Sequence, residues 1–164
     1  MNSTSRTHYT YVDTPIGALL VAGSAERICE IHFAGALPRP DWTVDDGALA
    51  YAAAQLHAYF AGERQAFDLP LQPAGTEFQR AVWTRLCAIP FGETTTYSAI
   101  AHAIGRPDAV RAVGAANGAN PIPVVVPCHR VIGKSGALTG FGGGMEVKRW
   151  LLDHEARVAG RLLF

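Results

Sequence analysis

Residues 96–119 read Thr-Tyr-Ser-Ala-Ile-Ala-His-Ala-Ile-Gly-Arg-Pro-Asp-Ala-Val-Arg-Ala-Val-Gly-Ala-Ala-Asn-Gly-Ala. Thr96 can cap a short helix from Tyr97 to Ile104, and Gly105 can end it. Pro107 suits the first position of a second helix, because its missing N–H has no partner there in any case. Two short helices joined by a tight, glycine-containing turn predict a helix-turn-helix.

The second of these helices carries almost no bulky side chains. Between Ala109 and Ala119, Arg111 is the only charged residue. Small side chains let a helix lie very close to another surface. Two interpretations stay open: tight packing in the core, which is the simpler one, or docking into a nucleic-acid groove with one cation projecting.

The next segment, residues 120–131, reads Asn-Pro-Ile-Pro-Val-Val-Val-Pro-Cys-His-Arg-Val. Three consecutive valines indicate burial on both faces. The prolines exclude the segment from the centre of a sheet. We therefore expect a rigid, apolar, non-helical segment that brings Cys128 and His129 to a fixed place.

Adjacent Cys128 and His129 suggest a thiol with its base. A thiol is a good nucleophile only as thiolate, and a base with its own orienting carboxylate can supply the activation. Neighbouring side chains of an extended backbone point to opposite faces, so the pair needs a sharp turn or a bridging water. A buried structural cysteine is the alternative.

A final helix is predicted over Met145–Val158, and it supplies a candidate carboxylate. Glu155 falls on the apolar arc that also holds Val147 and Leu151. A carboxylate in that position must be paired or hydrogen-bonded. Lys148 shares the arc, so a simple Lys148–Glu155 pair at a surface edge is an alternative.

The first part of the chain is predicted to be rich in β-strands. Strands are expected at Thr7–Asp13, Ala18–Ala22 and Ile28–Phe33, the last with alternating burial, followed by a loop at Gly35–Asp46. A helix over Ala48–Phe60 would take Asp45 or Asp46 as its N-cap. The proline-punctuated residues 67–74 end at Gly75, where we place a domain boundary.

After that boundary, Thr76-Glu77-Phe78-Gln79 has the form of a capping box. An amphipathic helix follows and stops before Pro90. Cys87 lies in the apolar part of this helix and is expected in the core. Gly-rich residues 134–144 predict a hairpin or loop around Phe141.

Composition and charge restrict the class of protein. The chain has 164 residues, of which 49% are hydrophobic and 17% charged, and its net charge is zero. Four basic against eight acidic residues give residues 1–75 a net charge of −4, and ten against six give residues 76–164 a net charge of +4. The positive excess permits a polyanionic partner for the second part.

No run of residues is apolar enough to span a membrane, and the first residues lack the apolar stretch of a secretory signal. Three cysteines without an export signal indicate reduced thiols in the cytoplasm. Cys29-x-x-His32 resembles half of a zinc site, but no second pair has suitable spacing, so no metal is expected.

Several ordered motifs together resemble the O6-alkylguanine-DNA alkyltransferases. They are Ile89-Pro90-Phe91-Gly92-Glu93-Thr94, Arg111-Ala112-Val113-Gly114, Asn120-Pro121, Pro127-Cys128-His129-Arg130-Val131, Gly143-Gly144 and Trp150-Leu151-Leu152-x-His154-Glu155. The resemblance covers essentially the whole chain. It implies an α+β protein with a ribonuclease-H-like β-rich domain over residues 1–75. A helical domain with a helix-turn-helix, which binds DNA and accepts the alkyl group, would follow over residues 76–164.

The resemblance implies a function for five residues of the catalytic site. Cys128 would attack the alkyl carbon on guanine O6, with His129 as base through a water and Glu155 orienting His129. Asn120 would organise the backbone and the relay by hydrogen bonding. Tyr97 would give a proton to the departing guanine, because a neutral purine leaves more easily than an anion.

The resemblance also implies a DNA interface. Arg111 would fill the gap left in the duplex when the damaged base is flipped out. Ala112, Gly114 and Ala115 would let the helix enter the minor groove. Arg130 is expected to contact DNA as well.

The base pocket would include Val131, Phe141 and Gly142. Phe141 stands where several relatives carry Tyr, and Gly142 where some carry Ser, so a hydroxyl contact to the base is lost. No cofactor is implied, because double-stranded DNA with an alkylated guanine is itself the donor. A thioether has no easy reverse reaction, so each molecule would act once. We expect a cytoplasmic monomer without membrane contact; cooperative assembly on DNA and activity on O4-alkylthymine stay open.

Two other functions compete with this one. A non-catalytic alkyltransferase-like protein would flip and flag lesions, but such relatives lack the acceptor cysteine that Cys128 supplies. A thiol hydrolase using Cys128, His129 and Glu155 would turn over repeatedly and would need no DNA. Neither the Arg111 helix nor the charge division would then have a role.

Overall fold

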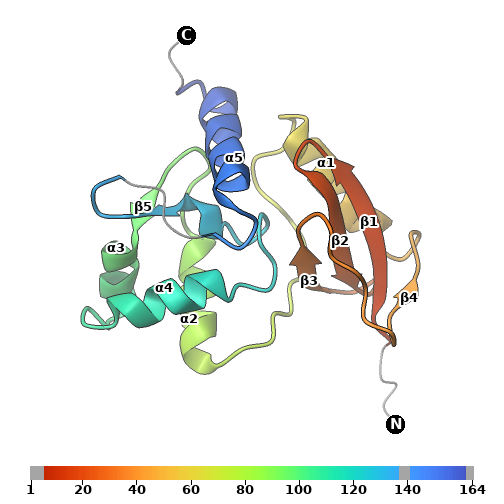
Figure 1. The fold of residues 1–164 in the computed structure, drawn as a ribbon, viewed down its shortest axis with the longest axis horizontal. Helices are drawn as coiled ribbons and strands as arrows, with labels where there is room; N and C mark the ends of the chain where they lie inside the picture. The colour runs from red at the N-terminus through yellow and green to blue at the C-terminus, as the bar shows by residue number, and fades with distance from the viewer. Residues whose placement is uncertain (1–5, 137–140, 162–164) are drawn as a thin grey trace. The chain divides into compact units, whose positions relative to one another are not determined.

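The computed structural model describes residues 6–136 and 141–161. The chain divides into two compact units, Met1–Ala74 and Gly75–Phe164 (Figure 1). The division falls one residue before the boundary expected after Gly75. The first unit is β-rich and the second is helical, which is the α+β class that the sequence predicts.

The N-terminal unit is a four-stranded sheet in the order β3-β2-β1-β4. Its strands are β1 (His8–Thr14), β2 (Gly17–Gly23), β3 (Ile28–His32) and β4 (Thr43–Val44). A tight turn joins β1 and β2 into a hairpin, and β4 pairs with β1 in parallel. Helix α1 (Ala50–Phe60) packs against β1. Residues 19–22 of β2 are all buried, as expected for a strand that is covered on both faces.

Three predictions for this unit are corrected. Ile28 and Ile31 of β3 are both buried instead of alternating, because the register with β2 shifts at Ala22/Gly23. The predicted loop 35–46 contains β4. Helix α1 begins at Ala50 without a side-chain cap, since the Asp45 carboxylate accepts the Ala48 N–H, before the helix starts.

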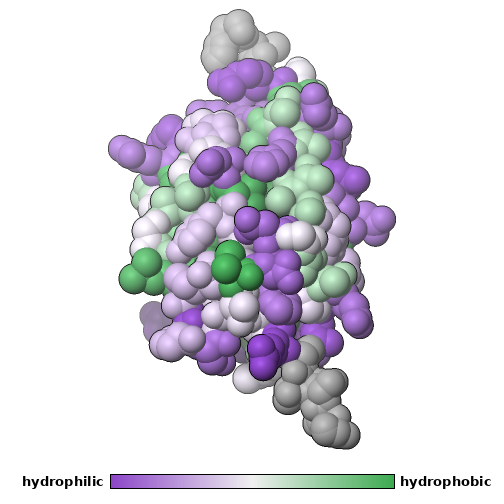
Figure 2. Space-filling model, turned by 90° about the vertical axis from the view of Figure 1, so that its right-hand side faces the viewer, coloured by the Kyte–Doolittle hydropathy of each residue, from purple (hydrophilic) through white to green (hydrophobic). Residues whose placement is uncertain are grey.

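The face of the molecule that Figure 2 shows carries many hydrophilic side chains, and its most strongly hydrophobic side chains lie in a few separate places. In the N-terminal unit the large apolar side chains with most exposure are Tyr11, Leu37 and Val44. Singly exposed apolar residues are normal on soluble domains. Within the described ranges, no helix is long and apolar enough to cross a membrane.

The C-terminal unit is built from helices and one small parallel sheet. Its elements are α2 (Glu77–Leu86), β5 (Thr95–Thr96), α3 (Tyr97–Ala103), α4 (Val110–Gly118), the 3₁₀ turn η1 (Cys128–Arg130), β6 (Val131–Ile132) and α5 (Met145–Val158). β5 pairs with β6, which ties the start of α3 to the end of η1. The predicted final helix is confirmed.

Local capping decides where the first helices of this unit begin. The Thr76 hydroxyl accepts the Gln79 N–H at 3.1 Å and the Gln79 side chain accepts the Thr76 N–H at 2.9 Å, so the predicted capping box is confirmed. The Thr96 hydroxyl likewise accepts the Ala99 N–H at 3.1 Å and starts α3. The prediction that Cys87 lies in the core is wrong, because Cys87 is the exposed C-cap residue of α2.

Helices α3 and α4 form the predicted helix pair, with Gly105 in the left-handed region at φ 75°. Pro107 does not open α4, which begins at Val110. Pro107 lies in a turn closed by the Ala109 N–H donating to the Arg106 carbonyl at 2.9 Å, so the helix starts only after this turn. The Trp83 indole donates to the Ala116 carbonyl at 2.8 Å and fixes α2 to α4.

Candidate active site and nucleic-acid interface

A strained turn delivers Cys128 to the interior of the C-terminal unit. The Val126 N–H donates to the Ile122 carbonyl at 2.9 Å, and Val124 within this turn has φ 74°. The left-handed region is costly for a β-branched residue. The Asn120 amide donates to the Val126 carbonyl at 2.8 Å, and its oxygen accepts the Ile122 N–H at 3.0 Å. Asn120 therefore holds the turn from inside.

The Cys128 thiol is almost enclosed, with 5% of the residue exposed. Burial raises the pKa of Cys128 to about 11, against smaller lowering effects from a hydrogen bond with Asn120 and the charge of Lys148. At neutral pH the sulfur therefore carries its proton. A nucleophilic Cys128 needs a base that removes this proton when the substrate is in place.

His129 follows in the same 3₁₀ turn, so the backbone has the sharp bend that the adjacent pair requires. Its Nε2 donates to Glu155 Oε2 at 2.7 Å, and both side chains are buried. Nδ1 has no hydrogen-bond partner among the residues that the structure describes. Burial lowers the pKa of His129 more than Glu155 raises it, so the ring is neutral at pH 7 with Nδ1 as an acceptor.

Arg130 completes the turn and faces inward. Its Nε donates to Glu155 Oε1 at 2.7 Å, its Nη2 to Glu155 Oε2 at 2.9 Å, and its Nη1 to the Ile89 carbonyl at 2.7 Å. Only 6% of the residue is exposed. The expectation that Arg130 contacts DNA is therefore corrected, because its guanidinium is held by internal acceptors.

The Glu155 carboxylate is the centre of this network. Burial alone would raise the pKa of Glu155, but the hydrogen bonds and charges of His129 and Arg130 outweigh burial and hold it well below its ordinary value. Glu155 is thus an anion throughout the physiological range. Sequence reasoning found Glu155 and His129 but missed this partner, since an arginine beside a cysteine–histidine pair suggests a surface contact as readily as a buried one.

Lys148 is fully buried and its Nζ donates to the Val131 carbonyl at 2.7 Å. Lys148 and Glu155 are both buried, so the alternative that they form a simple pair at a surface edge is wrong. The Nζ also lies 5.9 Å from the centre of the Phe141 ring. Val131 itself is completely buried.

Phe141 is half-buried and Gly142 is exposed in the segment that leads into α5. Lys134, Ser135 and Gly136 are exposed on the other side of the expected glycine-rich loop, and its residues 137–140 lie outside the described part of the chain. The structure therefore places both ends of this loop.

Helix α4 presents two different faces. Val113, Ala116 and Asn117 are buried against the rest of the unit, whereas Arg111, Ala112 and Ala115 are exposed. Gly114 lies between these faces, and a Cβ added there would come within 3.9 Å of the Tyr97 ring. One face therefore packs in the core, as the simpler interpretation predicts, and the face that carries Arg111 is left open to a partner.

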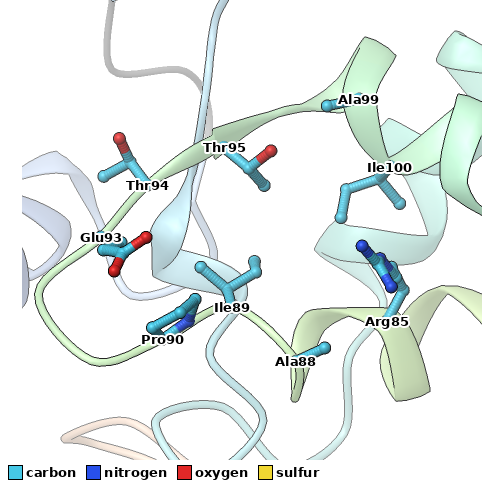
Figure 3. Close-up of a pocket in the computed structure, with 9 residues that line it drawn as sticks. All are labelled: Arg85, Ala88, Ile89, Pro90, Glu93, Thr94, Thr95, Ala99 and Ile100. Atoms are coloured by element: carbon cyan, nitrogen blue, oxygen red, sulfur yellow. The ribbon is translucent and has the colours of Figure 1, made fainter.

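A small cavity of about 210 Å³ opens between the end of α2 and the start of α3 (Figure 3). Arg85, Glu93 and Ile89 are among the residues that line it. Arg130 donates to the Ile89 carbonyl, so the cavity wall adjoins the network around Glu155. Sequence reasoning gave no sign of this cavity.

The described residues contain no group of His, Cys, Asp and Glu that could hold a metal ion. In β3 the His32 Nε2 lies 2.8 Å from Glu30 Oε1, and Cys29 is a half-buried free thiol. This pair is part of the strand, as expected. His57 and His102 lie on exposed helix positions.

The C-terminal unit thus combines a helix-turn-helix, one face of which is exposed and built of small residues, with a buried Cys128 beside a His129–Glu155 pair. This combination belongs to a class of proteins that bind DNA. Family models described as the ribonuclease-like domain and the DNA binding domain of 6-O-methylguanine DNA methyltransferase match residues 7–73 and 77–157. The chain belongs to this methyltransferase family.

Individual relatives agree with this assignment over most of the chain. The methylated-DNA–protein-cysteine methyltransferase of Mycobacterium tuberculosis strain H37Rv is 51% identical over 151 residues, covering 90% of this chain and 92% of the relative. The one of Methanosarcina barkeri is 46% identical, covering 90% and 96%. The crystal structure of Mycobacterium tuberculosis OGT in complex with DNA has 51% identity and a TM-score of 0.88, covering 92% of this chain and 94% of that one.

Proposed function

We propose that this protein repairs DNA directly, by moving an alkyl group from O6-alkylguanine in double-stranded DNA to the sulfur of Cys128. The observation that carries the proposal is the relay in one turn: a buried thiol followed by a histidine whose ring donates to Glu155 at 2.7 Å. The names of the relatives point to the same substrate class and the same acceptor residue type.

The transfer begins with removal of the thiol proton. A thiol with a pKa near 11 is unreactive at pH 7, so His129 takes the proton as the alkyl carbon approaches. Nδ1 accepts it through a bridging water, and the Glu155 carboxylate stabilises the imidazolium that forms. The new S–C bond replaces the C–O6 bond of guanine.

The guanine leaves as a neutral base. Its electron pair stays on the purine, and Tyr97 at the start of α3 supplies the proton that neutralises it. The ring of Tyr97 lies beside Gly114 of α4, where a glycine leaves room next to the phenol. Asn120 keeps Cys128 in place through its two backbone hydrogen bonds.

The buried position of Cys128 requires the damaged base to leave the helical stack. The exposed face of α4 is suited to the minor groove, because Ala112 and Ala115 add little bulk. Arg111 projects from the same face and would occupy the space that the flipped base leaves. Phe141, Gly142 and Val131 would form the pocket, without a hydroxyl from either of the first two.

The product is a thioether, which has no easy return to a thiol. Each molecule therefore accepts one alkyl group, and no cofactor takes part. A cytoplasmic location belongs to the proposal, because the acceptor must stay a free thiol. We propose a monomer in the absence of DNA.

A duplex with a single O6-methylguanine tests the proposal. Mixed with this duplex, the protein should gain one methyl group per molecule on the Cys128 peptide, as measured by mass spectrometry. Cys128→Ala should bind the lesion without any transfer. Transfer by that variant, or lesion binding without an adduct in the unaltered protein, would contradict the assignment. Repeated hydrolysis of an ester would indicate a thiol hydrolase instead.

A further inference from the structure

We propose that Arg130 is a positioning residue for the transfer: its guanidinium balances the buried Glu155 carboxylate, so that the His129–Glu155 pair carries no additional proton and Nδ1 of His129 can accept one. This inference rests on the proposed function. It adds a requirement that the relay alone does not contain, namely a fixed positive charge on its far side.

The geometry makes Glu155 the shared acceptor of two donors. Oε2 accepts from His129 Nε2 at 2.7 Å and from Arg130 Nη2 at 2.9 Å, while Oε1 accepts from Arg130 Nε at 2.7 Å. The forked arrangement fixes the carboxylate plane, and through Oε2 it fixes the imidazole. The Ile89 carbonyl and the Phe91 ring, 5.6 Å from the guanidinium carbon, hold Arg130 on its other sides.

The charge balance decides what Nδ1 can do. With Arg130 present, the buried group Arg⁺–Glu⁻–His is neutral overall. Without that cation, a buried carboxylate is uncompensated and the pair takes up a proton. Whether this proton stays on Glu155 or moves to the ring, Nε2 becomes the acceptor or both nitrogens carry hydrogen. In both cases Nδ1 becomes a donor and can no longer act as the base.

Other charged and titratable groups around His129 do not supply the same balance. Lys148 of α5 is buried and donates to the Val131 carbonyl, and its charge acts on Cys128 as well. Cys87 at the end of α2 feels the charge of Arg130, and Cys128 interacts electrostatically with Lys148, but neither thiol carries a positive charge that could balance Glu155. Arg130 contacts both oxygens of Glu155 through two nitrogens of its guanidinium.

The test is the rate of methyl transfer in a single turnover against pH, for the unaltered protein, Arg130→Met and Arg130→Lys. The unaltered protein should keep its rate down to about pH 6, since neutral His129 persists there. Arg130→Met should be about tenfold slower at pH 7 and should recover at higher pH, because the extra proton is then lost. Arg130→Lys keeps the cation but not the fork, so its rate should drop evenly without a shifted profile.

A matched control is Arg157→Met, which removes an exposed arginine from α5 and should leave the profile unchanged. A profile of Arg130→Met that runs parallel to that of the unaltered protein would overturn the inference, because loss of structure alone slows transfer equally at every pH.

NMR titration of the His129 ring without DNA, in the unaltered protein and in Arg130→Met, gives a second readout that needs no transfer: Nδ1 should carry a proton at pH 7 only in the variant. The ring of the unaltered protein should stay neutral below its usual pKa; uptake of a proton at pH 6.5 or above would overturn the inference. If the unaltered protein fails to methylate Cys128 at every pH, the proposed function fails, and the titration still tests the role of Arg130.

Discussion

Val124 is a β-branched residue with φ 74°, and it is the only non-glycine residue with positive φ in the described ranges. It is also buried, so two effects compete at this position. The side chain stabilises the fold by burial, while its backbone conformation costs about 1–2 kcal/mol. The turn that presents Cys128 is therefore maintained by side-chain packing, which outweighs the unfavourable backbone conformation of Val124.

Substitution of Val124 should invert the usual order of glycine and alanine. Both variants lose buried area, but only alanine keeps the unfavourable left-handed geometry. We expect Val124→Gly to be more stable than Val124→Ala by about 1 kcal/mol in urea denaturation. The matched pair is Val126, which is buried without positive φ; there alanine should be the more stable by about 0.5–1 kcal/mol. If the glycine and alanine variants had the same order of stability at both sites, the backbone of Val124 would not be strained.

Arg111 is exposed on α4, so its replacement should weaken the binding of DNA without changing the stability of the fold. Without its side chain, the cost of unstacking the damaged base, a few kcal/mol, has less compensation. We expect Arg111→Ala to slow methyl transfer and weaken lesion binding by about tenfold or more, with an unchanged melting temperature. Arg157→Ala removes an equal charge elsewhere in the unit and serves as the control. Unaltered repair kinetics in Arg111→Ala would remove its proposed role.

Helix α2 offers a direct measure of how much local capping contributes. The Thr76 hydroxyl and the Gln79 side chain satisfy two N–H groups that would otherwise lack helical partners. Thr76→Ala should lower the free energy of unfolding by about 1 kcal/mol. Thr84→Ala, at an exposed position in the last turn of α2 and away from the cap, should change it by less than about 0.5 kcal/mol. A similar loss from both variants would show that the cap is not responsible.

The elements that could be predicted from sequence are those that carry their own boundary signals. The capping box at Thr76 and the hydroxyl cap at Thr96 place the starts of α2 and α3 correctly. Pro107 carries an equally valid start signal, yet the same residue also favours a turn, and the turn forms. β4 has only two residues, Thr43 and Val44, and exists through its pairing with β1.

The candidate site divides in the same way. Cys128, His129 and Glu155 are recognisable from residue type and helical position, and the structure brings His129 and Glu155 together. The protonation states of these residues cannot be predicted from the sequence, because they depend on burial and on partners that lie far away along the chain. Arg130 shows this most clearly: its acceptors are Ile89 and Glu155, 41 and 25 residues away. Only the folded unit defines such contacts.

The stability of the complete chain should pass through a plateau as pH changes. The pKa of His129 is lowered by burial and that of Glu155 is lowered by its partners, so both groups stabilise the fold above their unfolded pKa values. This contribution declines as pH falls below about 6.5, and further below about 4.3. The free energy of unfolding, measured by urea denaturation between pH 4 and 8, should fall as the pH is lowered. A protein that becomes more stable toward acid pH would contradict this prediction.

The alkaline limit of the plateau has a different origin. The pKa of Cys128 is raised from 9.0 to about 11, so the fold favours the protonated thiol and loses stability as pH rises through this interval. Each pH unit there should cost about 1.4 kcal/mol. Cys128→Ala should remove this part of the decline in urea denaturation above pH 9. An identical alkaline limb in that variant would exclude Cys128 as its source.

The enclosure of the Cys128 sulfur also bears on how long an unspent molecule lasts. A thiol that keeps its proton and has 5% exposure reacts poorly with peroxides, disulfides and dissolved electrophiles. A protein that can accept only one alkyl group is inactivated by any other reaction of that sulfur, so the low reactivity of Cys128 preserves its repair activity. The stock of ready molecules then falls with the number of lesions met, and the cell's tolerance of a burst of damage equals the supply it has already made.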